Sequence, residues 1–126
     1  MYAVDTWKGT LIEESTQKDP RIPMLYQIFL SNVKHAKLTH KIVPIRMDSL
    51  EAARSINVKA DLIYIDASHD TLSVYNDIMA WIPHLLEGGI MTGDDWASSA
   101  VQTGVILAAK KLNKKVHGQD NFWWYE

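Results

Sequence analysis

Two apolar runs of strand length, each ending abruptly in acidic residues, constrain the fold of this chain most. The run Leu62 to Ile65 is apolar on both sides of a strand, which predicts a buried strand of a parallel sheet. It ends in Asp66-Ala67-Ser68-His69, and a second run, Gly89 to Gly93, ends in Asp94-Asp95. Ligands bind beyond the carboxyl ends of strands in open α/β sheets, so chemistry is expected at these two strand ends.

Length and composition narrow the class of protein. The 126 residues suffice for a single domain, 1–126, with a sizeable core. The formal net charge of −2 gives no reason to expect nucleic acid or an anionic membrane as a partner. The chain has no cysteine, which excludes a disulfide framework, a thiol nucleophile and a thiolate metal site. Its apolar runs are shorter than the ~20 residues of a membrane span. No signal-peptide pattern is visible, so we expect a cytoplasmic protein.

Strand-length and helical patterns alternate along the chain. The expected strands are 2–4, 41–47, 61–65, 89–93 and a C-terminal hairpin formed by 115–117 and 122–125. The expected helices are 20–37 with Asp19 as N-cap, 50–56, 72–86, and one from Ser98 or Ser99 to Leu112. Pro44 lacks an N–H and favours an edge position for its strand. This order predicts an α/β fold with a mostly parallel sheet, helices on both faces and an antiparallel end.

The acids at the two strand ends form the candidate site. Adjacent parallel strands lie about 4.8 Å apart, so Asp66, Asp94 and Asp95 would be crowded together. Like charges at this separation raise one another's pKa unless a cation neutralises them, and oxygen ligands suit Mg²⁺. His69 follows Asp66 by three positions and is a candidate general base for a substrate hydroxyl acidified by the metal.

Structural roles compete with the catalytic interpretation at several of these positions. Asp48 begins a capping box with Glu51, and Asp70 directly precedes a predicted helix, so each has a role as an N-cap. One of Asp94 and Asp95 has the alternative of being a solvated loop acid. These alternatives stay open from the residues alone.

Five segments of the chain resemble class I S-adenosylmethionine-dependent methyltransferases. They are Val4–Gly9, Phe29–Val33, Ile45–Ala53, Tyr64–His69 and Gly88–Trp96. Within that class the sequence resembles the metal-dependent O-methyltransferases related to enzymes that modify macrolide sugars and cephamycins. The resemblance spans nearly the whole chain in the same order, and it implies a Rossmann-like sheet.

The resemblance also implies how the cofactor would be bound. Asp5, at the end of the family's second strand, would bind the ribose hydroxyls of S-adenosylmethionine. Met47, Asp48 and Ser49 would border the adenine.

For the acceptor side, the resemblance implies that Asp66, Asp94 and Asp95 hold Mg²⁺. His69 would be the base that takes the proton of the acceptor hydroxyl. Methyl transfer is an in-line displacement that needs an aligned, deprotonated oxygen, so a metal and a base are the useful catalytic groups.

One departure from the family pattern concerns the first strand. No G-x-G-x-x-G loop is present, and the chain begins where the family's second strand would begin. The family's strand order is 3-2-1-4-5-7-6, so the missing first strand leaves a gap at the centre of the sheet. Either the strand at 2–4 pairs directly with 61–65, or another chain fills the gap. We therefore expect a homo-oligomer or strand exchange.

Three functions are compatible with these features. The first is a Mg²⁺-assisted, S-adenosylmethionine-dependent O-methyltransferase acting on a small-molecule or sugar hydroxyl, and the resemblance favours it. The second is a catalytically inactive, truncated methyltransferase fold that serves as an assembly or binding module. The third is a phosphoacceptor receiver domain, which also has acids at strand ends but requires a lysine at a following strand end, and none lies at a matching position.

Overall fold

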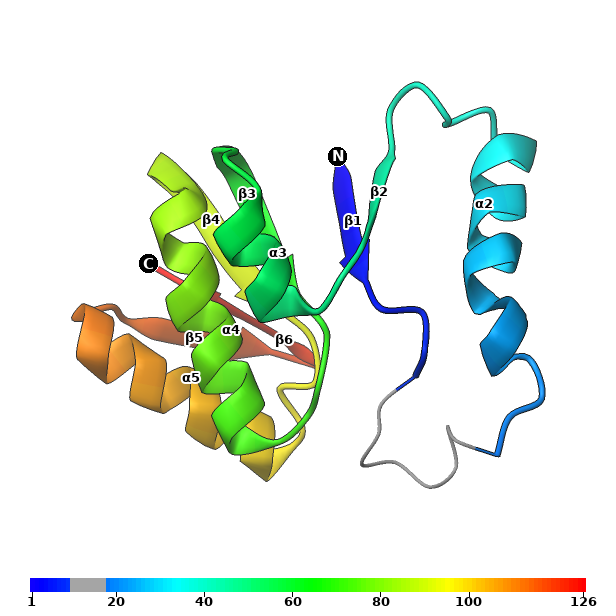
Figure 1. The fold of residues 1–126 in the computed structure, drawn as a ribbon. Coiled ribbons are helices and arrows are strands. Elements are labelled where there is room, and N and C mark those ends of the chain that lie inside the picture. The colour runs from blue at the N-terminus through cyan, green and yellow to red at the C-terminus, as the bar shows by residue number, and fades with distance from the viewer. Residues whose placement is uncertain (10–17) are drawn as a thin grey trace. The chain divides into compact units, whose positions relative to one another are not determined.

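The computed structural model of the protein describes residues 1–9 and 18–126 (Figure 1). They divide into two compact units, Met1–Ala52 and Ala53–Glu126. The expectation of a single domain over 1–126 stays a prediction.

The first unit contains a two-stranded parallel sheet. Strand β1 (Tyr2–Asp5) pairs with β2 (Val43–Arg46), with Tyr2 opposite Val43 and Asp5 opposite Arg46. The strand predicted over 41–47 is therefore shorter than expected. Pro44 lies in a strand that has a single partner in this sheet, as its missing N–H predicted.

The helix of the first unit begins later than predicted. Residues Ile22–Met24 form a 3₁₀ turn, and the regular helix α2 spans Leu25–His35. The proline at the centre of that turn disfavours helical backbone in the residue before it, so the α-helix starts only after it. Asp19 is not the cap of α2, because it instead accepts a hydrogen bond of 2.8 Å from the backbone N–H of Arg21.

An aromatic cluster joins α2 to the chain that leaves β1. Trp7 is buried, and its ring lies 4.8 Å from the ring of Tyr26 and 4.8 Å from that of Phe29. The guanidinium of Arg46 stacks over the Tyr26 ring at 4.8 Å, a cation–π contact. These contacts fix the loop at the carboxyl end of β1, directly after Asp5.

Helix α3 (Ser49–Ser55) begins at the cap that the sequence predicted. The Asp48 carboxylate accepts hydrogen bonds from the N–H groups of Leu50 at 2.9 Å and Glu51 at 3.4 Å. These are the first N–H groups of the helix, which have no partner within it, so the capping role of Asp48 is confirmed.

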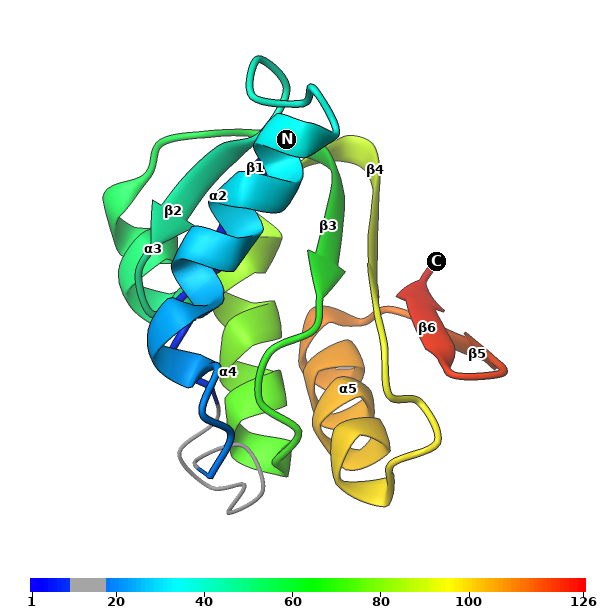
Figure 2. The same ribbon diagram turned by 90° about the vertical axis from the view of Figure 1, so that its right-hand side faces the viewer.

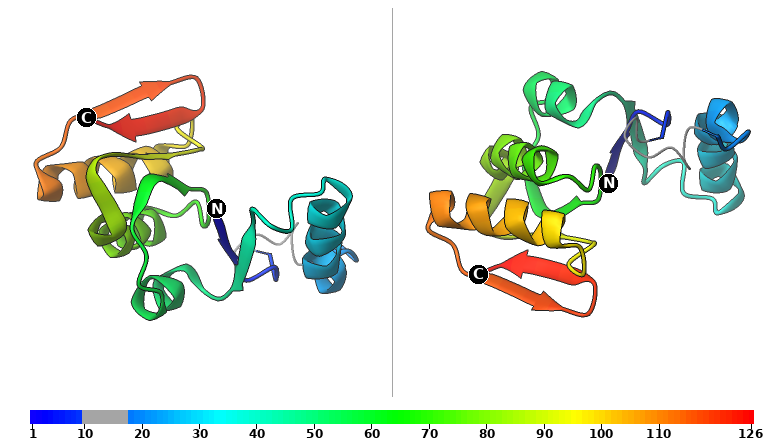
Figure 3. Two further views of the ribbon diagram at one scale, coloured as in Figure 1. Left: turned by 90° about the horizontal axis from the view of Figure 1, so that it is seen from above. Right: turned by 90° about the horizontal axis from the view of Figure 1, so that it is seen from below.

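The second unit is built on a four-stranded sheet with the order β3-β4-β6-β5. The strands are β3 (Ala60–Ile65), β4 (Leu85–Gly93), β5 (Val116–Gln119) and β6 (Phe122–Tyr125). β3 and β4 are parallel, whereas β6 is antiparallel to both β4 and β5. Figure 3 shows the C-terminal hairpin beside β4, which confirms the antiparallel end of the predicted sheet.

Helices α4 (Thr71–Trp81) and α5 (Ser99–Leu112) lie side by side (Figure 2). The hydroxyl of Thr71 donates to the carbonyl of Ala100 at 2.9 Å, which joins the two helix starts. The predicted helix 72–86 ends early, since Ile82–His84 forms a 3₁₀ turn around its proline. As a result β4 begins four residues before the predicted strand at 89.

The core of this unit lies between the two helices and one face of the sheet. Its buried residues include Ile63, Val74, Ile78, Met91, Val105, Ala108, Trp123 and Tyr125. β3 was predicted to be buried on both faces, and this is wrong in the described structure. Leu62 is 58% exposed and Tyr64 is 46% exposed. Side chains alternate along a strand, so only the face that carries Ile63 reaches the core.

The described strands fall into two sheets, one in each unit. Pairing of 2–4 with 61–65 would join the two units, and it stays a prediction. β3 is an edge strand of its own sheet.

Among residues 1–9 and 18–126, no helix has both the length and the apolar character needed to cross a bilayer.

Tyr125 makes the stability of the fold sensitive to alkaline pH. Its buried hydroxyl donates to the Val105 carbonyl at 2.7 Å, and burial raises the pKa of this phenol. The folded protein keeps the proton where the unfolded chain loses it, so stability falls as pH rises above about 10. Tyr125→Phe should lose about 1 kcal/mol at neutral pH but show a smaller alkaline decline. Urea unfolding of both proteins at neutral pH and at a pH above about 10 tests this.

The matched control for that prediction is Tyr2→Phe, because Tyr2 is 51% exposed. This variant should follow the wild-type pH dependence. An alkaline decline in Tyr125→Phe equal to that of the wild type would contradict the assignment to Tyr125.

Candidate functional site

Two loops at the carboxyl ends of β3 and β4 carry the candidate site. The loop after β3 begins at Asp66 and contains His69, and it ends at Asp70, whose carboxylate accepts a hydrogen bond from the Ser73 N–H at 3.0 Å. Asp70 is therefore the N-cap of α4, as one of the sequence alternatives predicted. The cap fixes the end of the loop immediately after His69.

The loop after β4 carries the acid pair. Asp94 accepts hydrogen bonds from the N–H of Asp95 at 2.9 Å and from the side-chain amide of Asn121 at 2.7 Å. Asp95 has a φ of 60°, in the left-handed region that aspartate and asparagine tolerate better than most residues. The two neighbouring acids therefore have different surroundings, because Asp94 is held by Asn121.

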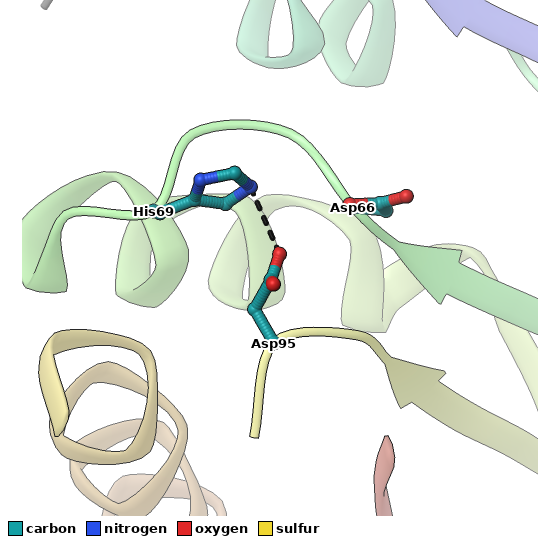
Figure 4. A group of neighbouring side chains, drawn as sticks. All are labelled: Asp66, His69 and Asp95. Atoms are coloured by element: carbon teal, nitrogen blue, oxygen red, sulfur yellow. Dashed lines mark ion pairs between the residues drawn. The ribbon is translucent and has the colours of Figure 1, made fainter. Parts of the chain in front are cut away.

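Asp66, His69 and Asp95 come together across the two loops (Figure 4). One ligand atom from each lies within 4.8 Å of the others, and Nε2 of His69 lies 2.9 Å from the Asp95 carboxylate. The His69 side chain is 41% exposed and that of Asp95 is 34% exposed, so a ligand can reach both. The structure thus brings together three of the four residues that the sequence analysis assigned to the acceptor side of the site.

The local electrostatics favour a bound cation. Partial burial raises the pKa of Asp66, and the charges of Asp94 and Asp95 raise it further, while His69 acts in the opposite direction. Burial and the same carboxylates also raise the pKa of Tyr64. Negative charge is therefore concentrated at this point, and a cation bound there would lower the cost of ionising Asp66.

A small hollow lies at the cluster. Asp66, His69 and Asp95 contribute polar groups, while Val101 and the buried Trp123 contribute apolar wall. The carboxylate oxygens of this set suit a hard divalent cation such as Mg²⁺ or Mn²⁺, and the imidazole lies beside them.

The residues assigned to the cofactor lie in the first unit. Asp5 accepts a hydrogen bond of 2.8 Å from the N–H of Trp7, and the Met47 N–H donates to the Asp5 carbonyl at 3.1 Å. Met47 is partly exposed, Asp48 caps α3, and Ser49 is the first residue of that helix. The four residues predicted to bind ribose and adenine therefore lie at the carboxyl ends of β1 and β2.

Sequence reasoning missed Asn121. It lies in the turn between β5 and β6, where a polar residue is expected for the turn itself. Its side chain nevertheless contacts Asp94, which is 27 positions away in the sequence. No local pattern marks such a contact, because it depends on β6 pairing with β4.

A family model described as a methyltransferase domain matches residues 1–96 of the chain. The protein belongs to this methyltransferase family. The match runs from β1 to Trp96, so it includes both strand ends that carry the acids. Membership confirms the resemblance to class I S-adenosylmethionine-dependent methyltransferases. No curated protein sequence matches the chain.

Solved structures confirm the fold of this methyltransferase domain. The O-methyltransferase NovP is 10% identical, with a TM-score of 0.74 over 99% of this chain and 58% of its own. CalS11, a calicheamicin methyltransferase, is 15% identical, with a TM-score of 0.65 over 99% and 59%. A caffeoyl-CoA O-methyltransferase homologue from Staphylococcus aureus is 14% identical, with a TM-score of 0.65 over 99% and 75%. The chain thus spans somewhat over half the length of NovP and CalS11.

Proposed function

We propose that this methyltransferase domain takes part in Mg²⁺-assisted methyl transfer from S-adenosylmethionine to a hydroxyl group. The observation that carries the proposal is the convergence of Asp66, His69 and Asp95 within 4.8 Å at two strand ends. The raised pKa of Asp66 supports it, because crowded carboxylates are the ordinary surroundings of a divalent cation. Asp66 and Asp95 would hold the metal, with Asp94 beside them.

His69 is proposed as the base. Its Nε2 lies 2.9 Å from Asp95, and this contact orients the imidazole. The carboxylate also stabilises the positive charge that the ring gains when it accepts the hydroxyl proton. A metal bound at the cluster supplies Lewis acidity, which lowers the pKa of a coordinated hydroxyl.

Asp5, Met47, Asp48 and Ser49 are proposed to bind S-adenosylmethionine. Asp5 uses one carboxylate oxygen for the Trp7 N–H, and a carboxylate can accept several further hydrogen bonds from ribose hydroxyls. Asp48 is committed to the α3 cap, so its contribution to the adenine pocket is mainly to fix the backbone at Met47 and Ser49. The G-x-G-x-x-G loop is absent from the sequence, so the proposal rests on the ribose and adenine residues alone.

A small-molecule or sugar hydroxyl is the proposed acceptor. CalS11 is named a TDP-rhamnose 3'-O-methyltransferase, so the acceptor of that protein is a sugar. The apo structure of CalS11 has a TM-score of 0.61 to this chain. The partly exposed His69 and Asp95 side chains are compatible with a compact polar substrate.

The test combines titration and turnover. S-adenosylmethionine is titrated calorimetrically with and without Mg²⁺, and transfer of a labelled methyl group to nucleotide-sugar and catechol acceptors is measured. Cofactor binding and metal-dependent transfer are expected. Absence of both would leave the inactive assembly module as the better description of the protein.

We further propose that a second copy of the chain covers the edge that β3 forms in its own sheet. Leu62 and Ile90 are 58% and 49% exposed on neighbouring positions of β3 and β4, beside the unpaired row of backbone groups. Light scattering after size exclusion should show a dimer, which Leu62→Lys shifts toward monomer. Leu72→Lys is the control, because Leu72 is 67% exposed on α4 instead. A monomeric wild type would contradict the proposal.

A further inference from the structure

Asn121, in the turn between β5 and β6, contacts the loop after β4 that runs from Asp94 to Ala97 and is called the acid loop below. Its backbone carbonyl accepts a hydrogen bond from the Trp96 N–H at 2.9 Å. Its side-chain oxygen accepts one from the Ala97 N–H at 3.2 Å. Its amide nitrogen donates to Asp94 at 2.7 Å and lies 3.5 Å from an oxygen of Asp95. Asn121 therefore contacts every residue of the loop from Asp94 to Ala97.

The chemistry of these partners fixes the orientation of the amide. Carboxylates only accept hydrogen bonds and a backbone N–H only donates, so the NH₂ group must face Asp94 and the oxygen must face Ala97. An aspartate at position 121 has no donor for Asp94. An alanine makes neither side-chain contact.

This arrangement separates the two acids of the pair. The amide of Asn121 and the N–H of Asp95 both hold one oxygen of Asp94. The indole N–H of Trp123 donates to the Asp94 carbonyl at 3.1 Å, which restrains the same residue from the other side. With Asp94 held, the left-handed backbone of Asp95 directs its carboxylate toward His69.

We propose that Asn121 is a positioning residue, which holds Asp94 and thereby sets Asp95 against His69 and Asp66. The inference rests on the proposed metal-assisted function and assigns a role to the C-terminal hairpin in it. Residues that hold metal ligands by hydrogen bonds change metal affinity about 10- to 100-fold when they are replaced. A comparable effect is expected here, although Asn121 is outside the cluster of Asp66, His69 and Asp95.

Mn²⁺ binding by the whole chain tests the role of Asn121. Free Mn²⁺ is measured by electron paramagnetic resonance for the wild type, Asn121→Ala and Asn121→Asp, with folding checked by circular dichroism. Both variants should bind Mn²⁺ about 10- to 100-fold more weakly. If residue 121 affected the site only through its charge, Asn121→Asp would bind Mn²⁺ more tightly and Asn121→Ala would bind it as the wild type does. Either result overturns the proposal. Asn57→Asp, exposed on the segment before β3, is the matched control and should bind like the wild type.

A second readout needs no metal and separates this proposal from the proposed function. The ring nitrogens of His69 report its pairing with Asp95 in ¹⁵N nuclear magnetic resonance spectra of the metal-free protein. The His69 signals should shift in both Asn121 variants and stay in place in Asn57→Asp. If the wild type binds no Mn²⁺ but these signals shift, the metal function fails and the positioning role stands. Unchanged His69 signals in both variants overturn the positioning role.

Discussion

Asp95→Asn is expected to abolish divalent-cation binding by this protein. Asparagine has nearly the same shape and also tolerates the left-handed φ of 60°, so the backbone of the loop should persist. The substitution removes a full negative charge from a group that meets Asp66 and His69 within 4.8 Å. Because replacing even a supporting residue costs up to about 100-fold in metal affinity, removing the charge of a ligand should cost more than that.

Thermal unfolding with and without Mg²⁺ measures this effect independently of methyl transfer. A cation at about 100 times its dissociation constant stabilises the wild type by about 2.7 kcal/mol, and Asp95→Asn should show none of this gain. Asp120→Asn is the matched control, because Asp120 is an exposed aspartate with a φ of 54° in the hairpin turn. Equal Mg²⁺ stabilisation of Asp95→Asn and the control would show that the cluster is not the metal site.

Asp95→Asn should also change how the stability of the metal-free protein depends on pH. The charge of Asp95 contributes to the raised pKa of Asp66. A carboxyl whose pKa is raised by folding binds its proton more tightly in the folded state, so the fold loses stability as pH rises through that range. Removing the Asp95 charge reduces this loss, and metal-free Asp95→Asn should be less sensitive to pH between acidic and neutral conditions than the wild type.

Gly93→Ala is expected to be strongly destabilising. A Cβ at Gly93 would overlap the carbonyl oxygen of Ile65 and lie 2.5 Å from the ring of Trp123. Neither partner can withdraw, since Ile65 belongs to the β3 backbone and Trp123 is only 1% exposed. Overpacking of this kind costs about 3 kcal/mol.

The expected consequence of Gly93→Ala extends to the acid loop. The Asp94 N–H donates to the same Ile65 carbonyl at 3.2 Å, so displacing that carbonyl displaces the first acid. Urea unfolding measures the loss of stability. Gly88→Ala is the control, because its Cβ would meet nothing within 4 Å and only its φ of 77° causes strain, about 1–2 kcal/mol. A loss in Gly93→Ala no larger than in the control would contradict the packing argument.

The sequence predicted the elements with strong local signals. The strand ends at Asp66 and Asp94 were correctly located, because an apolar run followed by an acid is a local pattern. Asp48 and Asp70 were likewise recognised as helix caps. The errors in the helix boundaries fall where a proline changes the backbone, since Pro23 and Pro83 shift a helix boundary by several residues.

Features that depend on how the strands pair could not be predicted from local sequence patterns. The exposed face of β3 also carries apolar side chains, so no pattern distinguishes Leu62 from Ile63. The pairing of His69 with Asp95 requires two loops to be packed against each other. The hydrogen bond from Asn121 to Asp94 likewise depends on the position of the C-terminal hairpin.

Trp123 gives the site an optical reporter. Its indole is 1% exposed, lines the hollow beside the acids and donates its N–H to the Asp94 carbonyl. A buried indole that is hydrogen-bonded to the acid loop should change its fluorescence when that loop shifts. The difference in emission between the wild type and Trp123→Phe therefore isolates the signal of Trp123, and it would allow the proposed cation binding to be followed in real time without a label.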